Sequence, residues 1–577
     1  MISRYKSCLL QLLCLYFLMG CQGAVDRSRE NALHDAYVPE FPSAVASSNA
    51  AAYYYFSLAQ MKLKSGDLSE GKWYLEKAMQ FDPRSAAIRM ELANLHLLNN
   101  DTDAALTLIQ QVLVDHPGSS DALTLAGRIY QQKKMDAEAK AFYEKALVGN
   151  PSDPNIYIHL GRIYWNERNL ANAERIFRLM AKNFPGSYAA HFFNGKVLAD
   201  QGKFDEAIAA FNRSLELEPS LEETRFELID IYRKRKMNAE VVKTYESILD
   251  FSPDNIRASF ELAVYYREIG KATNGLPLLL NLGARSQNEN SILTHVYENY
   301  LETKQYETAA WIFEGMLKGA PGSSELHYLA GVTYDGLNRA EKASRHLELV
   351  APSSRFYANA VIHRAVLKHD MGLVDQAIDI ILQALKTDPE QADYYLYLGS
   401  FYEESKRYSE ASDILEKGLA LDAENMRMRF RLGVVYDKIG WRQEAIALME
   451  KVLLAEPDNV KALNYLGYTY AEMGIELDKA EALIMRALKI KPQDGYITDS
   501  LAWVYFKQGK YEQALIWLEK AVALVPDDPV ILEHLGDVYQ RLDKSDLALK
   551  YYQRSLEIES KDREDLEEKI RAVTKKP

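Results

Sequence analysis

Proline recurs at a fixed interval along most of this 577-residue chain, and that interval constrains the fold more than any other feature. Successive members of the series are 34 or 68 residues apart, except across one residue inserted near Gly474. The series comprises Pro83, Pro117, Pro151, Pro185, Pro219, Pro253, Pro321, Pro389, Pro457, Pro492 and Pro526. A strict period of this length indicates a repeat architecture. If proline marks position 32 of a unit, residues 52–562 divide into fifteen units, and the thirteenth is one residue longer.

Each unit has the pattern of two amphipathic helices. Positions 4, 7, 8 and 11 form one apolar stripe and positions 20, 24 and 27 form another, which is the spacing of a single buried face on each helix. Position 8 is Gly in eight units and Ala in five, so we expect the two helices to approach closely there. A residue able to cap the next helix often follows the proline by two positions. Examples are Ser85, Ser119, Asp153, Ser187, Asn255, Ser323 and Asp494.

This pattern resembles the tetratricopeptide repeat, in which Gly or Ala at position 8, Tyr at position 11, Ala at position 20 and Pro at position 32 recur. The resemblance covers residues 52–562 and implies an all-α superhelical solenoid of about fifteen helix-turn-helix repeats. It also implies a concave groove lined by positions 2, 5, 9 and 12 of the first helices, with proteins as partners. Residues 563–577 are expected to form a polar capping helix and tail.

The first twenty residues have the pattern of an export signal. Arg4 and Lys6 precede an apolar run over residues 8–20, which is too short to span a bilayer. The run ends in Leu-Met-Gly before Cys21, an ending that resembles the lipobox of bacterial lipoproteins. That resemblance implies cleavage before Cys21 and its acylation with lipid, including palmitate, whereas the alternative is an ordinary signal peptide with an incidental cysteine. Residues 21–51 are then expected to form a lipidated flexible tether.

The residue after the cysteine bears on location. Gln22 stands where, in the bacterial lipoproteins that the signal resembles, an aspartate would retain the protein at the inner membrane. The resemblance therefore implies attachment to the outer membrane of a bacterial envelope, on its periplasmic side. We expect the lipid to be the only contact with the membrane.

Composition and motifs argue against most other classes of function. The net charge of −13 does not favour nucleic-acid binding. The fifteen units leave no room for a catalytic domain, and the chain lacks G-x-S-x-G, H-E-x-x-H, G-x-x-x-x-G-K-[ST] and C-x-x-C motifs. The closest pair of histidines, His363 and His369, is six residues apart and so lies on different helix faces. We therefore expect a protein that is not an enzyme, with no metal, cofactor or small-molecule substrate.

Groove positions in the amino-terminal units combine cations and aromatic rings. Position 9 gives Arg128, Arg162 and Lys196 in consecutive units. Position 5 gives Ile158, Phe192, Phe226 and Phe260. Such a strip would hold an extended peptide or a helix of a partner. The alternative is that the phenylalanines belong to the core and that the cations pair with Glu227 or Asp230.

A second concave patch is expected near the carboxyl end. Positions 5 and 9 of the last three units are Asn464, Tyr468, Asp499, Trp503, Glu533 and Asp537. The surrounding sequence, including "DSLAWVYFKQGKYEQAL", resembles a carboxyl-terminal signature of bacterial repeat lipoproteins, some of which are adaptors of carboxyl-terminal processing proteases. The clamp for peptide carboxylates does not match, since Ile362 and Val366 stand at two of its positions.

Unit seven departs from the pattern. It lacks the proline at position 32 and carries Gly275, Pro277 and Gly283 within its second helix, which predicts a kink or break that acts as a hinge. An amino-terminal arm of seven repeats (52–289) and a carboxyl-terminal arm of eight repeats (290–562) would follow. The alternative is a degenerate repeat with no mechanical role.

These features together predict a lipid-anchored scaffold or adaptor that binds proteins through its concave surface. The leading hypothesis is an adaptor or assembly platform for periplasmic proteins, of which delivery of substrates to a protease is one form. The alternative is a structural component of a complex for polysaccharide export or cell-wall assembly.

Overall fold

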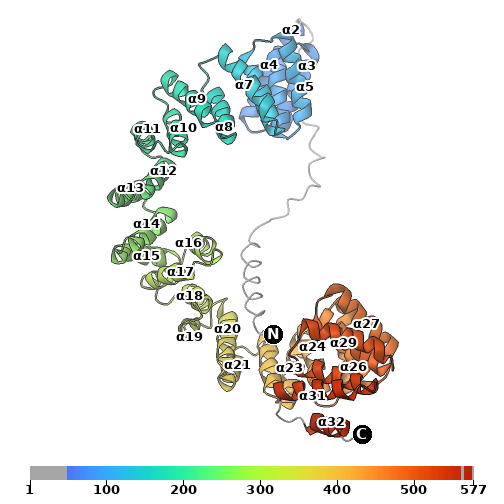
Figure 1. Ribbon diagram of the computed structural model, residues 1–577. Helices are drawn as coiled ribbons and strands as arrows, with labels where there is room; N and C mark the ends of the chain where they lie inside the picture. The colour runs from blue at the N-terminus through green and yellow to red at the C-terminus, as the bar shows by residue number, and fades with distance from the viewer. Residues whose placement is uncertain (1–47, 560–563, 575–577) are drawn as a thin grey trace. The chain divides into compact units, whose positions relative to one another are not determined.

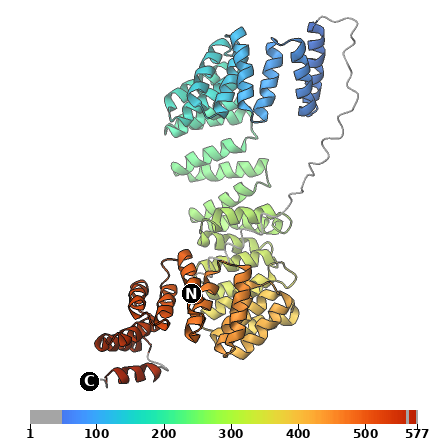
Figure 2. The same cartoon turned by 90° about the vertical axis from the view of Figure 1, so that its right-hand side faces the viewer.

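The computed structural model describes residues 48–559 and 564–574. All regular secondary structure in those residues is helical, and the helices follow one another as hairpin-like pairs (Figures 1 and 2). This confirms the predicted fold class, an all-α solenoid of helix-turn-helix repeats. The chain divides into two compact units, Met1–Phe251 (unit 1) and Ser252–Pro577 (unit 2).

The described part of unit 1 consists of six helix pairs. They are α2 (Ser48–Lys64) with α3 (Leu68–Phe81), α4 (Ala86–Leu98) with α5 (Thr102–Asp115), α6 (Ser120–Gln132) with α7 (Asp136–Gly149), α8 (Pro154–Asn166) with α9 (Leu170–Asn183), α10 (Tyr188–Asp200) with α11 (Phe204–Leu217), and α12 (Glu222–Lys234) with α13 (Asn238–Phe251).

The described part of unit 2 continues with nine pairs and a final helix. They are α14 (Ile256–Glu268) with α15 (Ala272–Arg285), α16 (Asn290–Val296) and η3 (Tyr297–Leu301) with α17 (Tyr306–Leu317), α18 (Ser324–Gly336) with α19 (Ala340–Glu348), α20 (Tyr357–Asp370) with α21 (Val374–Thr387), α22 (Ala392–Glu404) with α23 (Tyr408–Leu421), α24 (Met426–Lys438) with α25 (Arg442–Ala455), α26 (Val460–Met473) with α27 (Leu477–Ile490), α28 (Gly495–Lys507) with α29 (Tyr511–Leu524), α30 (Pro529–Arg541) with α31 (Ser545–Ile558), and lastly α32 (Glu564–Thr574).

Capping side chains start the first helices where the sequence predicts. The Asn255 side chain accepts a hydrogen bond of 2.8 Å from the backbone N–H of Ala258, and Asp153 accepts one of 2.9 Å from Asn155. The other predicted caps make equivalent bonds: Ser85, Ser119, Ser187, Ser323 and Asp494. Each such bond satisfies a backbone N–H that has no partner within its own helix, so the caps fix the register of the repeat.

The turn between the two helices of a repeat has one conformation in all fifteen repeats. Position 15 has a positive φ, between +55° and +89°, throughout the series. Seven members are glycines, and the others are Asn100, Lys134, Arg168, Lys236, Lys304, Asn338, Lys406 and Asp543. Because side chains other than glycine disfavour this conformation, packing of the two helices must impose it.

The small residue at position 8 lies directly against the large residue at position 24 of the same repeat. A Cβ added to Gly195 would lie 2.8 Å from the ring of Phe211, and one added to Gly127 would lie 2.7 Å from the ring of Tyr143. Phe211 and Tyr143 are both fully buried. Position 8 is therefore small because the ring of position 24 fills the space between the helices.

In several repeats a tyrosine forms a hydrogen bond with the preceding repeat, and we call this series of bonds the tyrosine ladder. The hydroxyl of Tyr at position 11 donates to a glutamate carboxylate at position 25 of the unit before, at 2.9–3.1 Å in three pairs, Tyr436–Glu416, Tyr470–Glu450 and Tyr539–Glu519. Tyr164–Glu144 and Tyr334–Glu314 make the same contact. Burial and the adjacent carboxylate raise the pKa of Tyr436 and of Tyr539 to about 12, which keeps the donating hydroxyl protonated at neutral pH.

The predicted start of the first helix is wrong. This helix begins at Ser48 rather than at residue 52, because Ala51 and Ala52 are buried against the rest of the repeat. Residues 48–51 therefore belong to a helix and not to a tether.

The predicted break in the seventh repeat does not occur. Helix α15 is continuous across Gly275, Pro277 and Gly283. A Cβ on Gly275 would meet the Ala263 carbonyl oxygen at 2.8 Å, and one on Gly283 would strike the backbone of Met316. These glycines thus permit close packing of neighbouring helices, and the division between compact units falls at residues 251 and 252 rather than at 289 and 290.

The irregular helix of unit 2 lies in the next repeat. Helix α16 passes into a π-helical turn, Tyr297–Leu301. Tyr297 stands at position 8, where most units have Gly or Ala, and position 24 of this repeat is the fully buried Phe313. The π-helical turn thus coincides with a large side chain at position 8.

We expect enlargement of position 8 to destabilise unit 1. Gly195→Val would force a branched side chain into the ring of Phe211, so the free energy of unfolding should fall by about 1–3 kcal/mol. Gly186→Val is the matched control, since a Cβ there has nothing within 4 Å. Chemical denaturation of both variants is the measurement, and equal stabilities would contradict the packing described.

The tyrosine ladder generates a second expectation. Tyr164→Phe removes the bond to Glu144 and should cost about 1 kcal/mol of unfolding free energy. Tyr130→Phe is the control, because Tyr130 occupies the same position 11 but position 25 of the preceding unit is Gln110. If the two variants unfold at the same denaturant concentration, the ladder contributes nothing to stability.

Candidate functional site

The predicted cations of unit 1 lie on three successive first helices. Arg128 is on α6, Arg162 on α8 and Lys196 on α10. Arg128 donates a 3.3 Å hydrogen bond to the side chain of Asn94, which holds the same repeat position on α4. Position 9 therefore forms a row across neighbouring first helices, as the repeat register predicts. We call this surface the unit 1 face, defined by Arg128, Arg162 and the pocket described next.

A pocket of about 220 Å³ lies beside Arg128. Its lining residues come from α4, α6 and α8 and are Leu97, Leu98, Arg128, Gln131, Gln132 and His159. Burial, with Arg128 and Arg162 nearby, lowers the pKa of His159, so this ring is neutral at pH 7. Leu98 is 64% exposed and Arg128 is also exposed. The unit 1 face thus offers a hollow lined by two leucines and by polar side chains, next to cationic donors.

The three cations are not equivalent. Lys196 is half-buried, forms a 2.6 Å ion pair with Glu227, and lies over the rings of Trp165 and Phe192. The alternative expected from sequence, pairing with Glu227, is therefore correct for Lys196. Arg162 is exposed and, in the part of the chain that the structure describes, forms no ion pair or hydrogen bond.

The predicted strip of phenylalanines is not a surface. Phe226 is 7% exposed and Phe260 is fully buried, with Phe260 stacked on His295 in unit 2. Both rings are buried in the core and cannot anchor a partner. Only Phe192 is partly accessible, and it packs on Phe211.

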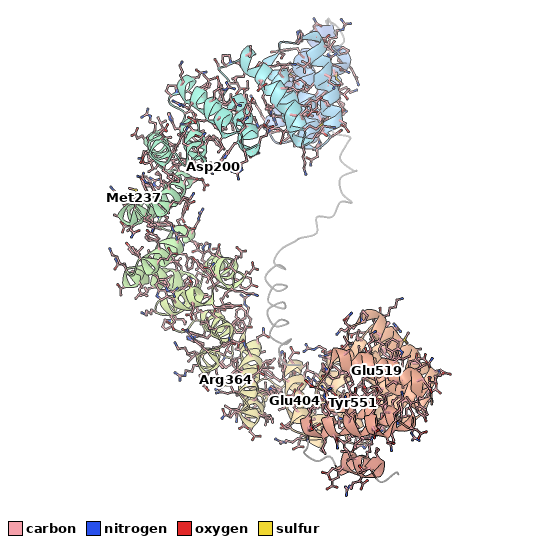
Figure 3. All side chains as sticks on the ribbon, viewed as in Figure 1. Asp200, Met237, Arg364, Glu404, Glu519 and Tyr551 are labelled. Carbon is pink, nitrogen blue, oxygen red and sulfur yellow. The ribbon has the colours of Figure 1, made fainter. Side chains whose placement is uncertain are left out.

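Trp165 lies outside positions 5 and 9, from which the groove residues were predicted. It holds position 12 of its repeat and is half-buried on the face that carries Lys196. Its indole N–H donates a 2.6 Å hydrogen bond to Asp200, a residue labelled in Figure 3. The signal was present in the sequence, because position 12 belongs to the same groove set.

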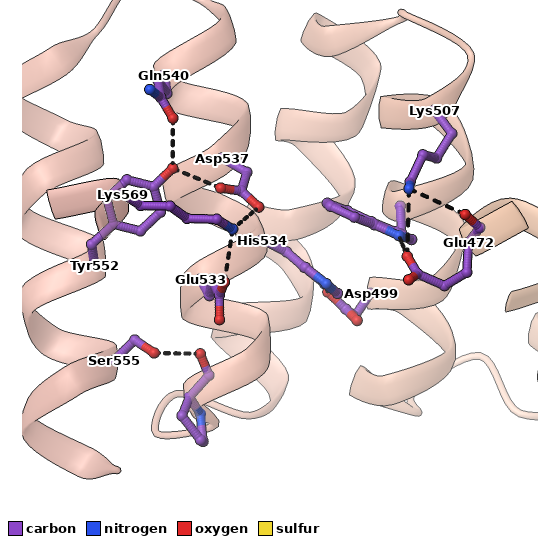
Figure 4. A network of polar contacts seen from close by, with 12 residues as sticks. Glu472, Asp499, Lys507, Glu533, His534, Asp537, Gln540, Tyr552, Ser555 and Lys569 are labelled. Atoms are coloured by element: carbon purple, nitrogen blue, oxygen red, sulfur yellow. Dashed lines mark hydrogen bonds and ion pairs between the residues drawn. The ribbon is translucent and has the colours of Figure 1, made fainter. Parts of the chain in front are cut away.

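Four residues of the second patch, Asp499, Trp503, Glu533 and Asp537, take part in polar contacts within unit 2 (Figure 4). Asp499 and Trp503 are buried, at 6% and 8% exposure. His534 forms a 2.9 Å contact with Asp499 and stacks on Trp503 at a centroid distance of 4.0 Å. Burial would lower the pKa of His534, but Asp499 outweighs it and the pKa is raised. Asp499 and Trp503 therefore belong to the interior, and the prediction that they form an accessible surface is wrong.

Lys569 neutralises the remaining acids of this network (Figure 4). It reaches from α32 to Glu533 at 2.7 Å and to Asp537 at 2.8 Å. Tyr552 donates a further 2.7 Å hydrogen bond to Asp537. The patch predicted to be acidic is thus internally paired, and Asn464 and Tyr468 beside it are half-buried. The sequence predicted an acidic surface here because it did not show that Lys569 of the capping helix pairs with these carboxylates.

Cys21 lies outside the described residues, as do the signal peptide and the tether up to residue 47. His363 pairs with Asp335 at 3.0 Å and His369 with Glu404 at 2.6 Å, so each links neighbouring repeats. No group of three or more potential metal ligands gathers within residues 48–559 and 564–574. No helix of that region is long and apolar enough to cross a bilayer.

Comparisons with known proteins identify the repeat. Tetratricopeptide repeat family profiles match residues 62–129, residues 159–222 and 365–426, and residues 120–147, 427–459 and 531–562, and a TPR repeat profile matches residues 503–543. Together these matches cover more than half of the chain. A search of curated proteins found no significant match.

Several solved structures are similar to parts or most of the chain. TTC0263, a thermophilic TPR protein of Thermus thermophilus, is 22% identical over 32% of this chain and 98% of its own, with a TM-score of 0.29. YrrB, described as a TPR protein with an unusual peptide-binding site, is 23% identical over 32% of this chain and 95% of its own, with a TM-score of 0.28. Naa15/Naa10 bound to HypK is 13% identical over 90% of this chain and 96% of the matched chain, with a TM-score of 0.32.

The matched profiles fall in both units, and the caps and the small residue at position 8 follow the same 34-residue register between them. Proteins built from this repeat generally mediate interactions between proteins. The chain is a tetratricopeptide repeat protein.

Proposed function

We propose that this protein is a non-enzymatic scaffold, anchored by lipid at Cys21 to the outer membrane of a bacterial envelope, that binds other proteins on the periplasmic side. The unit 1 face is the binding surface that we assign to this role. Its partner is a protein segment that combines acidic residues with an apolar side chain. Delivery of such partners to a periplasmic protease is the adaptor role that we favour.

One observation carries the assignment of the surface. Arg128 and Arg162 are exposed on neighbouring helices, and neither has a carboxylate partner among residues 48–251. Elsewhere on the same row Lys196 is paired with Glu227. A guanidinium group presents several donors in a rigid fork that matches a carboxylate, so two arginines without a carboxylate partner favour an acidic ligand.

The adjoining pocket adds selectivity. A volume of about 220 Å³ beside Arg128, with Leu97 and Leu98 in its lining, suits a single apolar side chain. Burial of that side chain would contribute affinity, while the arginines would orient the bound segment and increase its rate of association.

The proposed anchor rests on the sequence around Cys21. We expect Cys21→Ala to abolish incorporation of radiolabelled palmitate and to release the protein from the membrane fraction, because the thiol is the acceptor of the lipid. Cys8→Ala and Cys14→Ala are matched controls within the same signal and should leave labelling unchanged. Labelling that survives Cys21→Ala would exclude the anchor while leaving the unit 1 face untested by that result.

Capture of partners tests the binding surface. The double variant Arg128→Glu/Arg162→Glu should lose the proteins that crosslink to the wild type in cells, because charge reversal repels acidic segments. Arg84→Glu/Lys182→Glu carries the same change in net charge at exposed sites away from the unit 1 face, and should retain them. Mass spectrometry identifies the crosslinked proteins, with proteases or their substrates expected and polysaccharide exporters supporting the alternative. Equal recovery by both double variants would remove the unit 1 face from the account.

A further inference from the structure

A larger pocket lies on the second helices of unit 2, far along the chain from the unit 1 face. It has a volume of about 510 Å³, within the range of ligand-binding pockets. Its lining comes from α27, α29 and the turn after α27. The residues are Met485, Arg486, Leu488, Lys489, Pro492, Trp517 and Lys520. We call it the second-helix pocket.

The second-helix pocket coincides with a departure from the tyrosine ladder. The repeats on either side keep the ladder, with Glu450 accepting from Tyr470 at 3.0 Å and Glu519 accepting from Tyr539 at 3.1 Å. Between them, Met485 stands at the position of the glutamate. Tyr505 donates instead to Glu481 at 3.0 Å. The packing of the repeat thus does not require methionine at residue 485.

Met485 is also exposed, which is unfavourable for an apolar side chain without a partner. It is 45% exposed, and Ile516 on the neighbouring helix α29 is 66% exposed. The Trp517 ring is half-buried and completes the apolar wall. Large apolar and aromatic groups at an exposed hollow favour a binding surface over a purely structural one.

Cations surround this apolar wall. Lys489 and Lys520 are exposed and have no carboxylate partner within the described chain. The Lys520 ammonium lies 4.9 Å from the centroid of Trp517. Arg486 is paired with Asp458 at 2.9 Å, so the two lysines carry the uncompensated charge. A cationic rim on a protein with a net charge of −13 is complementary to an acidic ligand.

We infer that the second-helix pocket is a docking site for an acidic protein segment that inserts one large apolar side chain between α27 and α29. The apolar side chain contacts Met485 and Trp517, and acidic residues flanking it pair with Lys489 and Lys520. This site is separate from the unit 1 face and gives the scaffold a place for a second partner. It does not depend on the proposed role of the unit 1 face.

The test uses the chain from residue 22 onward with Arg128→Glu/Arg162→Glu, which removes the unit 1 face as a second acceptor, and compares every variant in that background. The ligand is a short fluorescein-labelled peptide of aspartates and glutamates around one phenylalanine. We expect fluorescence anisotropy to show binding that falls when the phenylalanine is replaced by serine and when salt is raised. Met485→Glu should weaken binding about tenfold or more, because it places a negative charge in the pocket. That variant restores the glutamate found at this position in neighbouring repeats, so the fold should be retained.

Charge reversal at the rim provides the second arm. Lys489→Glu/Lys520→Glu should also weaken binding about tenfold or more. Lys417→Glu/Lys451→Glu, at exposed lysines on the second helices α23 and α25, makes the same change in net charge, is the matched control and should bind normally. Circular dichroism and thermal unfolding of every variant show whether the fold is intact.

The outcomes separate this site from the unit 1 face. Binding that Met485→Glu and Lys489→Glu/Lys520→Glu leave unchanged in this background would place the peptide elsewhere and overturn the inference. Absence of binding to the Arg128→Glu/Arg162→Glu chain itself, or equal binding by the serine-substituted peptide, would overturn it as well. None of these results would alter the crosslinking outcome expected for the unit 1 face.

Discussion

Burial of the apolar side of each helix pair by the next pair is the constraint on which this structure depends. One pair can cover the small residue at position 8 with the ring at position 24, as Gly195 and Phe211 show, but its outer apolar side remains exposed until another repeat packs on it. Stability in such arrays is close to a sum of terms within repeats and between neighbours. The tyrosine ladder adds directional bonds between neighbours, since Tyr436, Tyr470 and Tyr539 each reach back to the preceding repeat.

That constraint does not fix the residue at most surface positions, and we propose that partners bind where surface residues depart from the repeat pattern. Arg162 in unit 1 lacks the carboxylate partner that Lys196 has in the next repeat. Met485 in unit 2 replaces the ladder glutamate and leaves an apolar side chain in solvent. By contrast, Lys569 closes the acids of the last repeats, so a surface that is conspicuous in the sequence is satisfied within the molecule. Internal pairing therefore decides which polar residues remain available to partners.

Much of the fold follows from the sequence because it depends on contacts within one period. The caps at Ser85 and Asn255 and the close approach at Gly127 all act within one repeat or at its junction with the next, where spacing alone determines the neighbours. The left-handed residue at position 15 was not predicted, because residues such as Lys134 and Arg168 give no sign of that conformation. The continuity of α15 was missed because Gly283 reads as a helix breaker, although it serves contact with the backbone of Met316.

The candidate sites were predicted less completely, because they depend on how one repeat is rotated against the next. Repeat register correctly placed Arg128 and Arg162 on one row, but it could not tell the buried Phe260 from the partly accessible Phe192. Hydrogen exchange followed by mass spectrometry tests the underlying account most directly. Slow exchange should occur in both helices of each repeat from residue 52 to 559 and fast exchange at the turns, so that the pattern recurs every 34 residues. Slow exchange should continue through Ala272–Arg285. Fast exchange throughout that helix, or protection with no 34-residue period, would contradict it.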